Sequence, residues 1–164
     1  KPFSEYCTKA GKGIFVLLRT SNPGMVDIEQ KELKEGGRVL DQVGNELERI
    51  SQEMKATYPD QTCSPVGAVV GCTEESDAKA LRDVYKDIYF LIPGYGAQGG
   101  DAKICGTLMK EAGGTVNSSR GILCAWKKDA DCTAKVENGT VTMEDIVTSA
   151  AKAAIASKED LLRF

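Results

Sequence analysis

Polar and apolar residues form two recurring patterns along this chain. Short runs of consecutive apolar residues alternate with longer segments in which apolar residues return every three or four positions. An unbroken apolar run is typical of a strand buried on both faces, and the wider spacing is typical of an amphipathic helix. The chain therefore predicts strands and helices in strict alternation, which is the organisation of a parallel sheet covered by helices.

Four units of strand and helix follow from this pattern. The strands are expected over residues 13–19, 66–71, 88–92 and 115–118. Three helices are indicated by apolar positions at Leu40, Val43, Leu47, Ile50 and Met54, then at Ala80, Leu81, Val84 and Tyr85, then at Ile104, Leu108 and Met109. Thr73 and Ser76 are suited to the start of the second of these helices.

Both ends of the chain and one polar segment complete the outline. Residues 1–10 look like the end of a helix, and the polar segment between Trp126 and Val141 is expected to be a surface loop. A last helix is expected to start near Thr142, because Thr142 and Asp145 fit a capping box. Its apolar positions, expected to be buried, are Ile146, Val147, Ala150, Ala154 and Ile155.

Composition narrows the class of protein and of partner. The 164 residues, 41% hydrophobic and 27% charged, suit one globular domain with a sizeable core. A net charge of -3, with no block of lysine and arginine longer than two, argues against nucleic acid or an anionic membrane as a partner. No apolar run reaches the roughly 18 residues of a membrane span, and residues 1–5 do not form a signal peptide. We therefore expect a cytoplasmic protein with small-molecule or protein partners.

The absence of histidine removes several kinds of chemistry. Histidine-based metal sites, Ser-His-Asp triads and Cys-His catalysis are excluded, so lysine, aspartate, glutamate, tyrosine or cysteine would have to move protons. The six cysteines are scattered without a C-x-x-C pair, which favours reduced structural thiols over a disulfide framework. We expect neither a metal site nor a cofactor.

A glycine-rich segment, residues 93–101, follows the third predicted strand directly. It holds four glycines within seven residues, at positions 94, 96, 99 and 100, and a helical pattern comes after it. Bare backbone amides at the start of a helix favour an anion, so the segment predicts a phosphate-binding loop. It also fits the dinucleotide pattern G-x-G-x-x-G, but the next strand ends in Ser118, Ser119 and Arg120 and offers no carboxylate for a ribose. A tight turn without a ligand is the other alternative.

The number of units indicates half of a larger fold. A (β/α)8 barrel takes about 250 residues, places its active site at the carboxyl ends of the strands, and often binds phosphate after strands seven and eight. Residues 1–164 are interpreted as a single partial domain, the C-terminal half of such a barrel with four βα units and parallel strands. On that count the glycine loop follows strand seven and Arg120 follows strand eight.

Three motifs at strand ends carry a resemblance to a known family. They are residues 20–24 (TSNPG), residues 93–101 (PGYGAQGGD) and residues 117–122 (NSSRGI). Together they resemble orotidine 5'-phosphate decarboxylase, in the bacterial branch whose loop reads P-G-[hydrophobic]-G-A-Q-G-G-D. The resemblance implies decarboxylation of orotidine 5'-phosphate to UMP without metal or cofactor, in a homodimer. For this chain it implies a homodimer or association with the missing N-terminal half.

The resemblance also assigns substrate-binding residues. In the family the serine matched by Ser21 contacts the amide edge of the pyrimidine, and the glutamine matched by Gln98 bridges the phosphate and the loop that covers the base. Gly99, Arg120 and Gly121 would hold the phosphate, since a guanidinium matches phosphate oxygens in a bidentate manner. The alternatives are an ordinary turn serine, a glutamine that only caps the next helix, and an exposed surface arginine.

The catalytic residues of the family are not found in this chain. The resemblance places an alternating lysine and aspartate array on the second and third strands of the barrel, which this chain lacks. Lys79, Asp83, Lys86 and Asp87 instead have the spacing of a solvated helix face. We therefore expect the chain alone to be inactive. Another phosphate-binding barrel enzyme and a non-catalytic half-barrel that binds ligands remain alternatives, and Ser21 speaks against the first.

Overall fold

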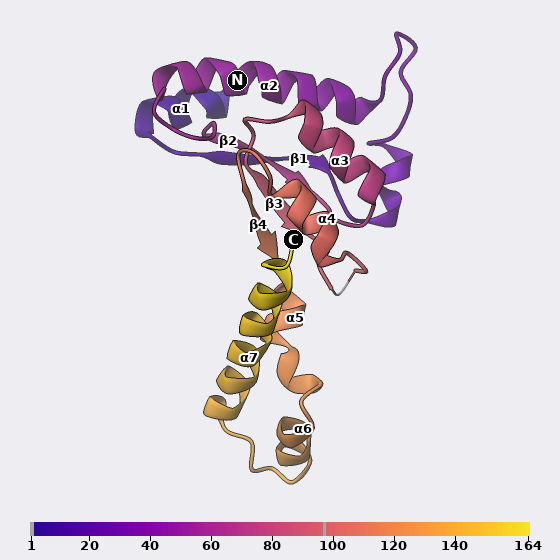
Figure 1. Cartoon of the computed structure of the whole chain (residues 1–164), viewed down its shortest axis with the longest axis vertical. Coiled ribbons are helices and arrows are strands. Elements are labelled where there is room, and N and C mark those ends of the chain that lie inside the picture. Colours follow the sequence, from indigo (N-terminus) through magenta and orange to yellow (C-terminus); the bar gives the residue numbers. More distant parts are fainter. Residues whose placement is uncertain (1, 97) are drawn as a thin grey trace. The chain divides into compact units, whose positions relative to one another are not determined.

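The computed structural model describes residues 2–96 and 98–164 (Figure 1). Lys1, which we expected in the first helix, and Ala97, in the glycine loop, lie outside the described residues. The chain forms two compact units, residues 1–117 and residues 118–164, and each is described by itself. The prediction that residues 1–164 are a single domain stays a prediction.

The first unit contains a parallel sheet with helices between its strands. The strands are β1 (Ile14–Arg19), β2 (Val66–Val70), β3 (Phe90–Pro93) and β4 (Gly114–Asn117). The helices are α1 (Pro2–Ala10), α2 (Val39–Thr57), α3 (Glu75–Val84) and α4 (Ala102–Leu108), with the 3-10 helix η1 (Pro23–Asp27) after β1. Every neighbouring pair is parallel and the order is β1-β2-β3-β4, so the four predicted strands and the α/β class are confirmed.

The two faces of this sheet are buried to different extents. Val66, Ala68 and Val70 on β2 and Phe90 and Ile92 on β3 are fully buried. On β1, by contrast, Phe15 and Leu17 are 49% and 63% exposed. Residues 13–19 were expected to be buried on both faces, and this was wrong for β1. The helices of the first unit cover one side of this strand, and alternate side chains point to the other.

A buried arginine, Arg82 on α3, forms hydrogen bonds with the backbone of several segments. Its guanidinium donates to the carbonyl of Leu108 twice, at 2.7 and 2.9 Å, and to the carbonyls of Tyr85, Ile88 and Gly113. The guanidinium carbon also lies 3.7 Å from the centre of the Phe90 ring. Burial lowers the pKa of Arg82 to about 10, so the side chain is still charged at neutral pH.

Two expectations about the first unit had different outcomes. Residues 2–10 form α1, which packs beside α2 (Figure 1), so the predicted N-terminal helix is confirmed. Thr73 does not cap α3, whose N-cap is Glu74. The hydroxyl of Thr73 instead accepts a hydrogen bond from Arg19, 54 residues away.

All elements of the second unit are helices. They are α5 (Ser119–Leu123), the 3-10 helix η2 (Ala125–Lys127), α6 (Ala130–Glu137) and α7 (Met143–Leu161). The segment expected to be a surface loop therefore contains α6. The missed signal is Asp129, whose side chain accepts from the amides of Asp131 and Cys132 and caps this helix.

The last helix begins where the sequence indicated. The Thr142 side chain accepts from the Asp145 amide, and the Asp145 side chain accepts from the Thr142 amide, so the predicted capping box is confirmed. Val147 and Ile155, expected to be buried, are 59% and 57% exposed. The other three apolar positions are half-buried. A correct helical spacing therefore identified the element but not how deeply its apolar face is covered.

All six cysteines are free, as expected for reduced thiols. Among the described helices, none is both long and apolar enough to cross a membrane.

Candidate functional site

The glycine loop between β3 and α4 depends on backbone geometry that other residues avoid. Gly94, Gly96 and Gly99 have φ angles of +99°, +70° and +87°. A side chain at any of these three positions would strain the backbone. The left-handed conformation of Gly96 and Gly99 agrees with what the sequence indicated for a loop shaped by glycine.

Three amides of this loop are not bare, contrary to expectation. The Gly96 amide donates to the Gly100 carbonyl at 2.9 Å, the Gly99 amide to the Gly96 carbonyl at 3.1 Å, and the Gly100 amide to the Gly94 carbonyl at 3.1 Å. The loop therefore closes on itself. An anion here would have to displace these bonds or be held by side chains and by other amides.

Close approach explains the glycine at two positions. A Cβ atom on Gly100 would lie 2.3 Å from the Cys72 sulfur and 2.9 Å from the Gly94 carbonyl oxygen. A Cβ atom on Gly94 would lie 3.1 Å from the Gln98 side-chain oxygen and 3.2 Å from the Cβ of Ser21. By contrast, nothing lies within 4 Å of a Cβ on Gly96 or Gly99. The two ends of the loop, at Gly94 and Gly100, thus pack against the turns that follow β1 and β2, and the tip has free space beside it.

Two of the predicted site residues, Ser21 and Gln98, are brought together although they are 77 positions apart. The Ser21 hydroxyl donates to the Oε1 atom of Gln98 at 2.5 Å, in an exposed position. Gln98 does not cap α4, since Asp101 does so by accepting from the Ile104 amide at 2.9 Å. The helix-cap alternative for Gln98 is therefore wrong. The Nε2 amide of Gln98 is not used in the bond to Ser21.

The position of Ser21 is set by its neighbours at the carboxyl edge of the sheet. Thr20 donates twice to the Glu29 carboxylate, from its amide at 2.8 Å and from its hydroxyl at 2.9 Å. A Cβ atom on Gly71 would lie 2.8 Å from the Ser21 amide nitrogen, so the turn after β2 runs directly against Ser21. Pro23 opens η1 immediately afterwards. The backbone of Ser21 is thus held between the turn after β2 and the glycine loop.

Sequence reasoning missed the arginine beneath this edge, Arg19. It is fully buried, and its Nη1 atom donates to the Gly71 carbonyl at 3.3 Å and to the Thr73 hydroxyl at 2.8 Å. Its Nε atom lies 3.4 Å from the Asp77 carboxylate, and Nε and Nη2 form no hydrogen bond. The signal was a charged residue at the end of an otherwise apolar strand. A buried cation there fastens the end of β1 to the turn after β2.

The remaining predicted contacts, Arg120 and Gly121, belong to the second unit. Both are exposed in α5, the short helix that begins two residues after β4 ends. A Cβ on Gly121 would lie 2.5 Å from the Ser118 hydroxyl, which explains the glycine. A shared site of Arg120 and Gly121 with Ser21, Gln98 and Gly99 of the first unit stays a prediction.

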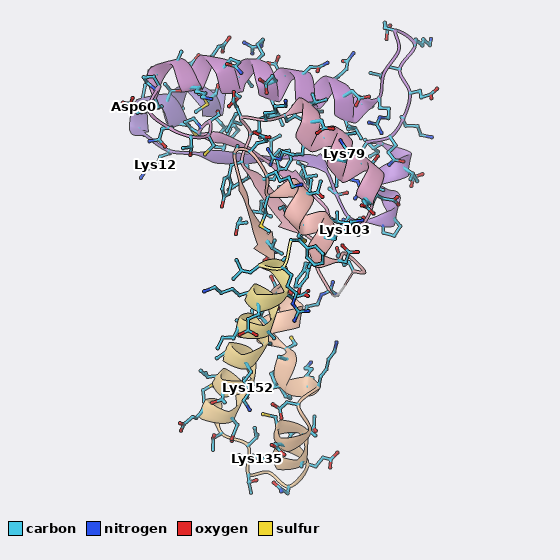
Figure 2. The ribbon with its side chains drawn as sticks, viewed as in Figure 1. Lys12, Asp60, Lys79, Lys103, Lys135 and Lys152 are labelled. Atoms are coloured by element: carbon cyan, nitrogen blue, oxygen red, sulfur yellow. The ribbon has the colours of Figure 1, made fainter. Side chains whose placement is uncertain are left out.

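The charged residues on α3 do not form a catalytic array. Lys79 lies on α3 (Figure 2). Lys79 and Asp83 are paired at 2.6 Å, with side chains 72% and 62% exposed. This pairing lowers the pKa of Asp83. Asp87 is bound instead by Lys55 of α2 at 2.6 Å. The prediction of a solvated helix face is confirmed for Lys79 and Asp83, whereas Lys86 and Asp87 lie beyond the end of α3. Within residues 2–96 and 98–164, no group of three or more metal-binding side chains comes together.

Comparison with known proteins identifies relatives of the whole chain. The chain is 43% identical over 164 residues to an orotidine 5'-phosphate decarboxylase of Clostridium acetobutylicum, covering 99% of this chain and 52% of that protein. It is 46% identical over 132 residues to the orotidine 5'-phosphate decarboxylase of Clostridium tetani, covering 80% of this chain and 45% of that protein. No family model matches the chain.

Solved structures share the fold. A Streptomyces avermitilis protein described as an orotidine 5'-phosphate decarboxylase superposes with a TM-score of 0.64 at 23% identity, covering 98% of this chain and 50% of that one. A UMP synthase of Leishmania donovani superposes with a TM-score of 0.55 at 26% identity, covering 91% of this chain and 30% of that one. This chain covers no more than half of either solved structure.

The parallel sheet and the glycine loop after its third strand define an α/β protein that corresponds to about half of a TIM barrel. The chain is homologous to the orotidine 5'-phosphate decarboxylases over nearly its entire length, and it corresponds to a C-terminal half of them. It spans about half the length of the curated relatives that it matches.

Proposed function

We propose that this chain is the phosphate- and pyrimidine-binding half of an orotidine 5'-phosphate decarboxylase, which converts orotidine 5'-phosphate to UMP and CO2 in pyrimidine biosynthesis. The observation that carries the proposal is the hydrogen bond between Ser21 and Gln98. It joins the loop after β1 to the glycine loop, where a ligand would need its base and its phosphate recognised side by side.

Each proposed contact has a chemical basis. Ser21 has one hydroxyl that can turn from Gln98 to a pyrimidine carbonyl or imide. Gln98 offers two amide protons that can donate to a phosphate oxygen. Gly99 leaves space at the tip of the loop, and Arg120 with the Gly121 amide would add charge-assisted hydrogen bonds of about 1.5–3 kcal/mol each. These groups bind and orient a nucleotide without a metal or a cofactor.

The chain lacks the groups that would perform the chemistry. Electrostatic preorganisation at the reacting carbon is usually the largest contribution to catalysis, and a general acid is needed to protonate the product carbanion. The lysine and aspartate array expected to supply both is absent from these residues. We therefore propose that the chain alone does not decarboxylate orotidine 5'-phosphate, and that in the cytoplasm it acts as part of a whole barrel.

The exposed side of β1 supports this requirement for a partner. Phe15 and Leu17 present apolar surface that a closed barrel would cover, and such surface favours association. The partner is proposed to be the N-terminal half of the barrel, in an assembly that is dimeric when complete.

Titration calorimetry tests the binding half of the proposal. The 164-residue chain is titrated with UMP, uridine and inorganic phosphate, alone and mixed with the half of the Clostridium acetobutylicum relative that it does not cover. UMP should bind at least tenfold more tightly than uridine. Equal affinity for UMP and uridine would contradict phosphate binding by the glycine loop. Tight binding of phosphate alone would favour a different phosphate-binding barrel enzyme.

Complementation tests the catalytic half. Decarboxylation, followed as loss of orotidine 5'-phosphate absorbance, should appear in the mixture and not in the chain alone. Arg120→Ala should weaken UMP binding in the mixture, whereas Arg163→Ala should not, because Arg163 is an exposed arginine of the same unit at the end of the chain. Turnover by the purified chain alone would show that catalytic residues lie within it.

A further inference from the structure

Arg19, the buried arginine at the end of β1, holds both ends of the turn after β2, residues 71–73. The Gly71 amide donates to the Arg19 carbonyl at 2.8 Å, and the Nη1 atom of Arg19 donates to the Gly71 carbonyl at 3.3 Å. The same Nη1 atom donates to the hydroxyl of Thr73, the last residue of the turn, at 2.8 Å. One residue of β1 therefore fastens the whole turn.

An irregularity in β1 gives the Arg19 side chain this position. Phe15 and Leu17 are exposed, and regular alternation along a strand would place Arg19 on the same face as these two residues. The register with β2 shifts between Leu17 and Arg19, however, which adds one residue to β1 at this point. Leu18 and Arg19 are consequently both buried, although they are adjacent.

The buried guanidinium of Arg19 is only partly satisfied. Its Nε atom lies 3.4 Å from the carboxylate of Asp77, which also lies 4.0 Å from the guanidinium of Arg38 and is therefore shared between two cations. Among the described residues, Nε and Nη2 have no hydrogen-bond partner. A buried charge with unpaired donors costs stability, and an apolar residue of similar volume would avoid this cost. Stability therefore does not explain an arginine here, whereas its hold on the turn does.

The turn that Arg19 holds lies against Ser21. A Cβ atom on Gly71 would lie 2.8 Å from the amide nitrogen of Ser21 and 2.8 Å from its Cβ, so the two backbones are in close contact. The Ser21 hydroxyl in turn donates to Gln98. A displacement of Gly71 would therefore change the position of Ser21 relative to Gln98.

The turn also meets the glycine loop, but through a bond that does not involve Arg19. The Cys72 amide donates to the Pro93 carbonyl at 3.2 Å. Substitution of Arg19 removes its side-chain bonds to the turn and leaves this backbone bond in place. We therefore expect the effect of a substitution to reach Ser21 and to spare the glycine loop.

We propose that Arg19 is a positioning residue for pyrimidine recognition. It holds Gly71 against Ser21, so that the Ser21 hydroxyl stays beside Gln98, where the base is read. The proposal rests on the function proposed above, because that function assigns Ser21 to the pyrimidine. Arg19 then contributes to binding of the base and not to binding of the phosphate.

Titration calorimetry with UMP and with ribose 5-phosphate, which lacks the base, tests this division. The titrations use the chain mixed with the half of its relative, as described above. Arg19→Met should weaken UMP binding at least tenfold and change the affinity for ribose 5-phosphate less than twofold. Arg19→Lys keeps a cation near Asp77 and a donor for the turn, so it should recover part of the lost UMP affinity. Equal losses for the two ligands would overturn the proposal.

Arg82 provides the matched control, because it is a second buried arginine of the first unit. Its guanidinium binds backbone carbonyls at the opposite ends of the strands, including those of Ile88 before β3 and Gly113 before β4. Arg82→Lys should lower stability towards urea and leave the ratio of the two affinities unchanged. If this ratio falls as far in Arg82→Lys as in Arg19→Met, a general loss of stability explains the effect and the proposal is wrong.

A double-mutant cycle shows whether Arg19 acts through Ser21. When Ser21 is already replaced by alanine, Arg19→Met should lower UMP affinity less than twofold further, because no hydroxyl remains to be positioned. Losses that multiply would give Arg19 a structural role only. If Arg19→Met does not fold, Thr73→Val takes its place in both experiments. It removes one acceptor of the guanidinium and keeps the buried cation, so a smaller loss, selective for UMP, is expected.

Amide hydrogen exchange separates failure of this proposal from failure of the proposed function. Arg19→Met should increase exchange over residues 20–22 and 71–73, whereas Arg82→Lys should increase it over residues 85–88 and 108–113. If the native chain does not bind UMP, the proposed function fails and pyrimidine recognition fails with it, while exchange still decides whether Arg19 positions Ser21. Unchanged exchange over residues 20–22 in Arg19→Met would refute the positioning role.

Discussion

Replacing Arg82 with methionine should be among the most destabilising single changes in the first unit. Methionine fills a similar volume along the stem but has no donors. The substitution removes five hydrogen bonds and leaves the carbonyls of Leu108, Tyr85, Ile88 and Gly113 without this partner in the interior. It also removes the cation from the Phe90 ring.

The size of the effect follows from opposing contributions. Hydrogen bonds to charged groups contribute about 1.5–3 kcal/mol each, but burying the guanidinium costs several kcal/mol and offsets much of the sum. Removing one partner of a buried charged network costs about 3–5 kcal/mol, and we expect a value in this range for Arg82→Met. That is at least about a fifth of the 5–15 kcal/mol by which a typical domain is stable.

Urea unfolding followed by circular dichroism at neutral pH measures this difference. Arg163→Met, at an exposed position, is the matched control and should change stability by less than about 0.5 kcal/mol. Arg82→Lys keeps the charge but cannot reach all four carbonyls, so it should lie between the native chain and Arg82→Met. This variant decides the matter if Arg82→Met does not fold. A loss below about 1 kcal/mol for both Arg82 variants would refute the argument.

Four further outcomes follow from the structure. Lys135 and Thr142 hold the pKa of Asp145 well below its usual range. The contribution of Asp145 to stability is therefore present above the ordinary carboxyl pKa and is lost as the pH falls through and below it. The melting temperature of Asp145→Asn should depend less on pH in acid than that of the native chain. Gly99→Val, at φ +87° with free space around it, should weaken UMP binding more than it lowers stability. Ser21→Ala and Gln98→Ala should show a coupling of about 1 kcal/mol in a double-mutant cycle on UMP affinity. Leu17→Glu, at an exposed position of β1, should reduce self-association in sedimentation experiments without unfolding the chain.

Each of these outcomes has a result that contradicts it. Equal acid sensitivity of native and Asp145→Asn chains would show that the capping box contributes nothing through charge. Unchanged UMP affinity in Gly99→Val would make this glycine a turn residue only. Additive effects at Ser21 and Gln98 would mean that their hydrogen bond does not act in binding. Self-association undiminished by Leu17→Glu would place the interface elsewhere.

Most of the fold and part of the candidate site could be predicted from local patterns. Apolar runs identified β1, β2 and β3 because strands of a parallel sheet are rich in apolar residues, even where, as on β1, one face is left uncovered. Thr142 with Asp145 located the start of α7 because a capping box is formed by residues three positions apart. Ser21, Gln98 and Gly99 were recognised because each lies in a short motif at a strand end.

Contacts between distant residues could not be predicted in this way. The bond from Ser21 to Gln98 and the bond from the buried Arg19 to Thr73 both join segments that meet only when the strands align. Nor does periodicity reveal that the loop amides bond to one another, or that Phe15 remains exposed. The sequence by itself therefore determined which elements form and which residues end them, because these depend on near neighbours. Only the tertiary structure decided which polar groups find partners and which apolar faces are covered, because burial depends on what the rest of the molecule brings to the same place.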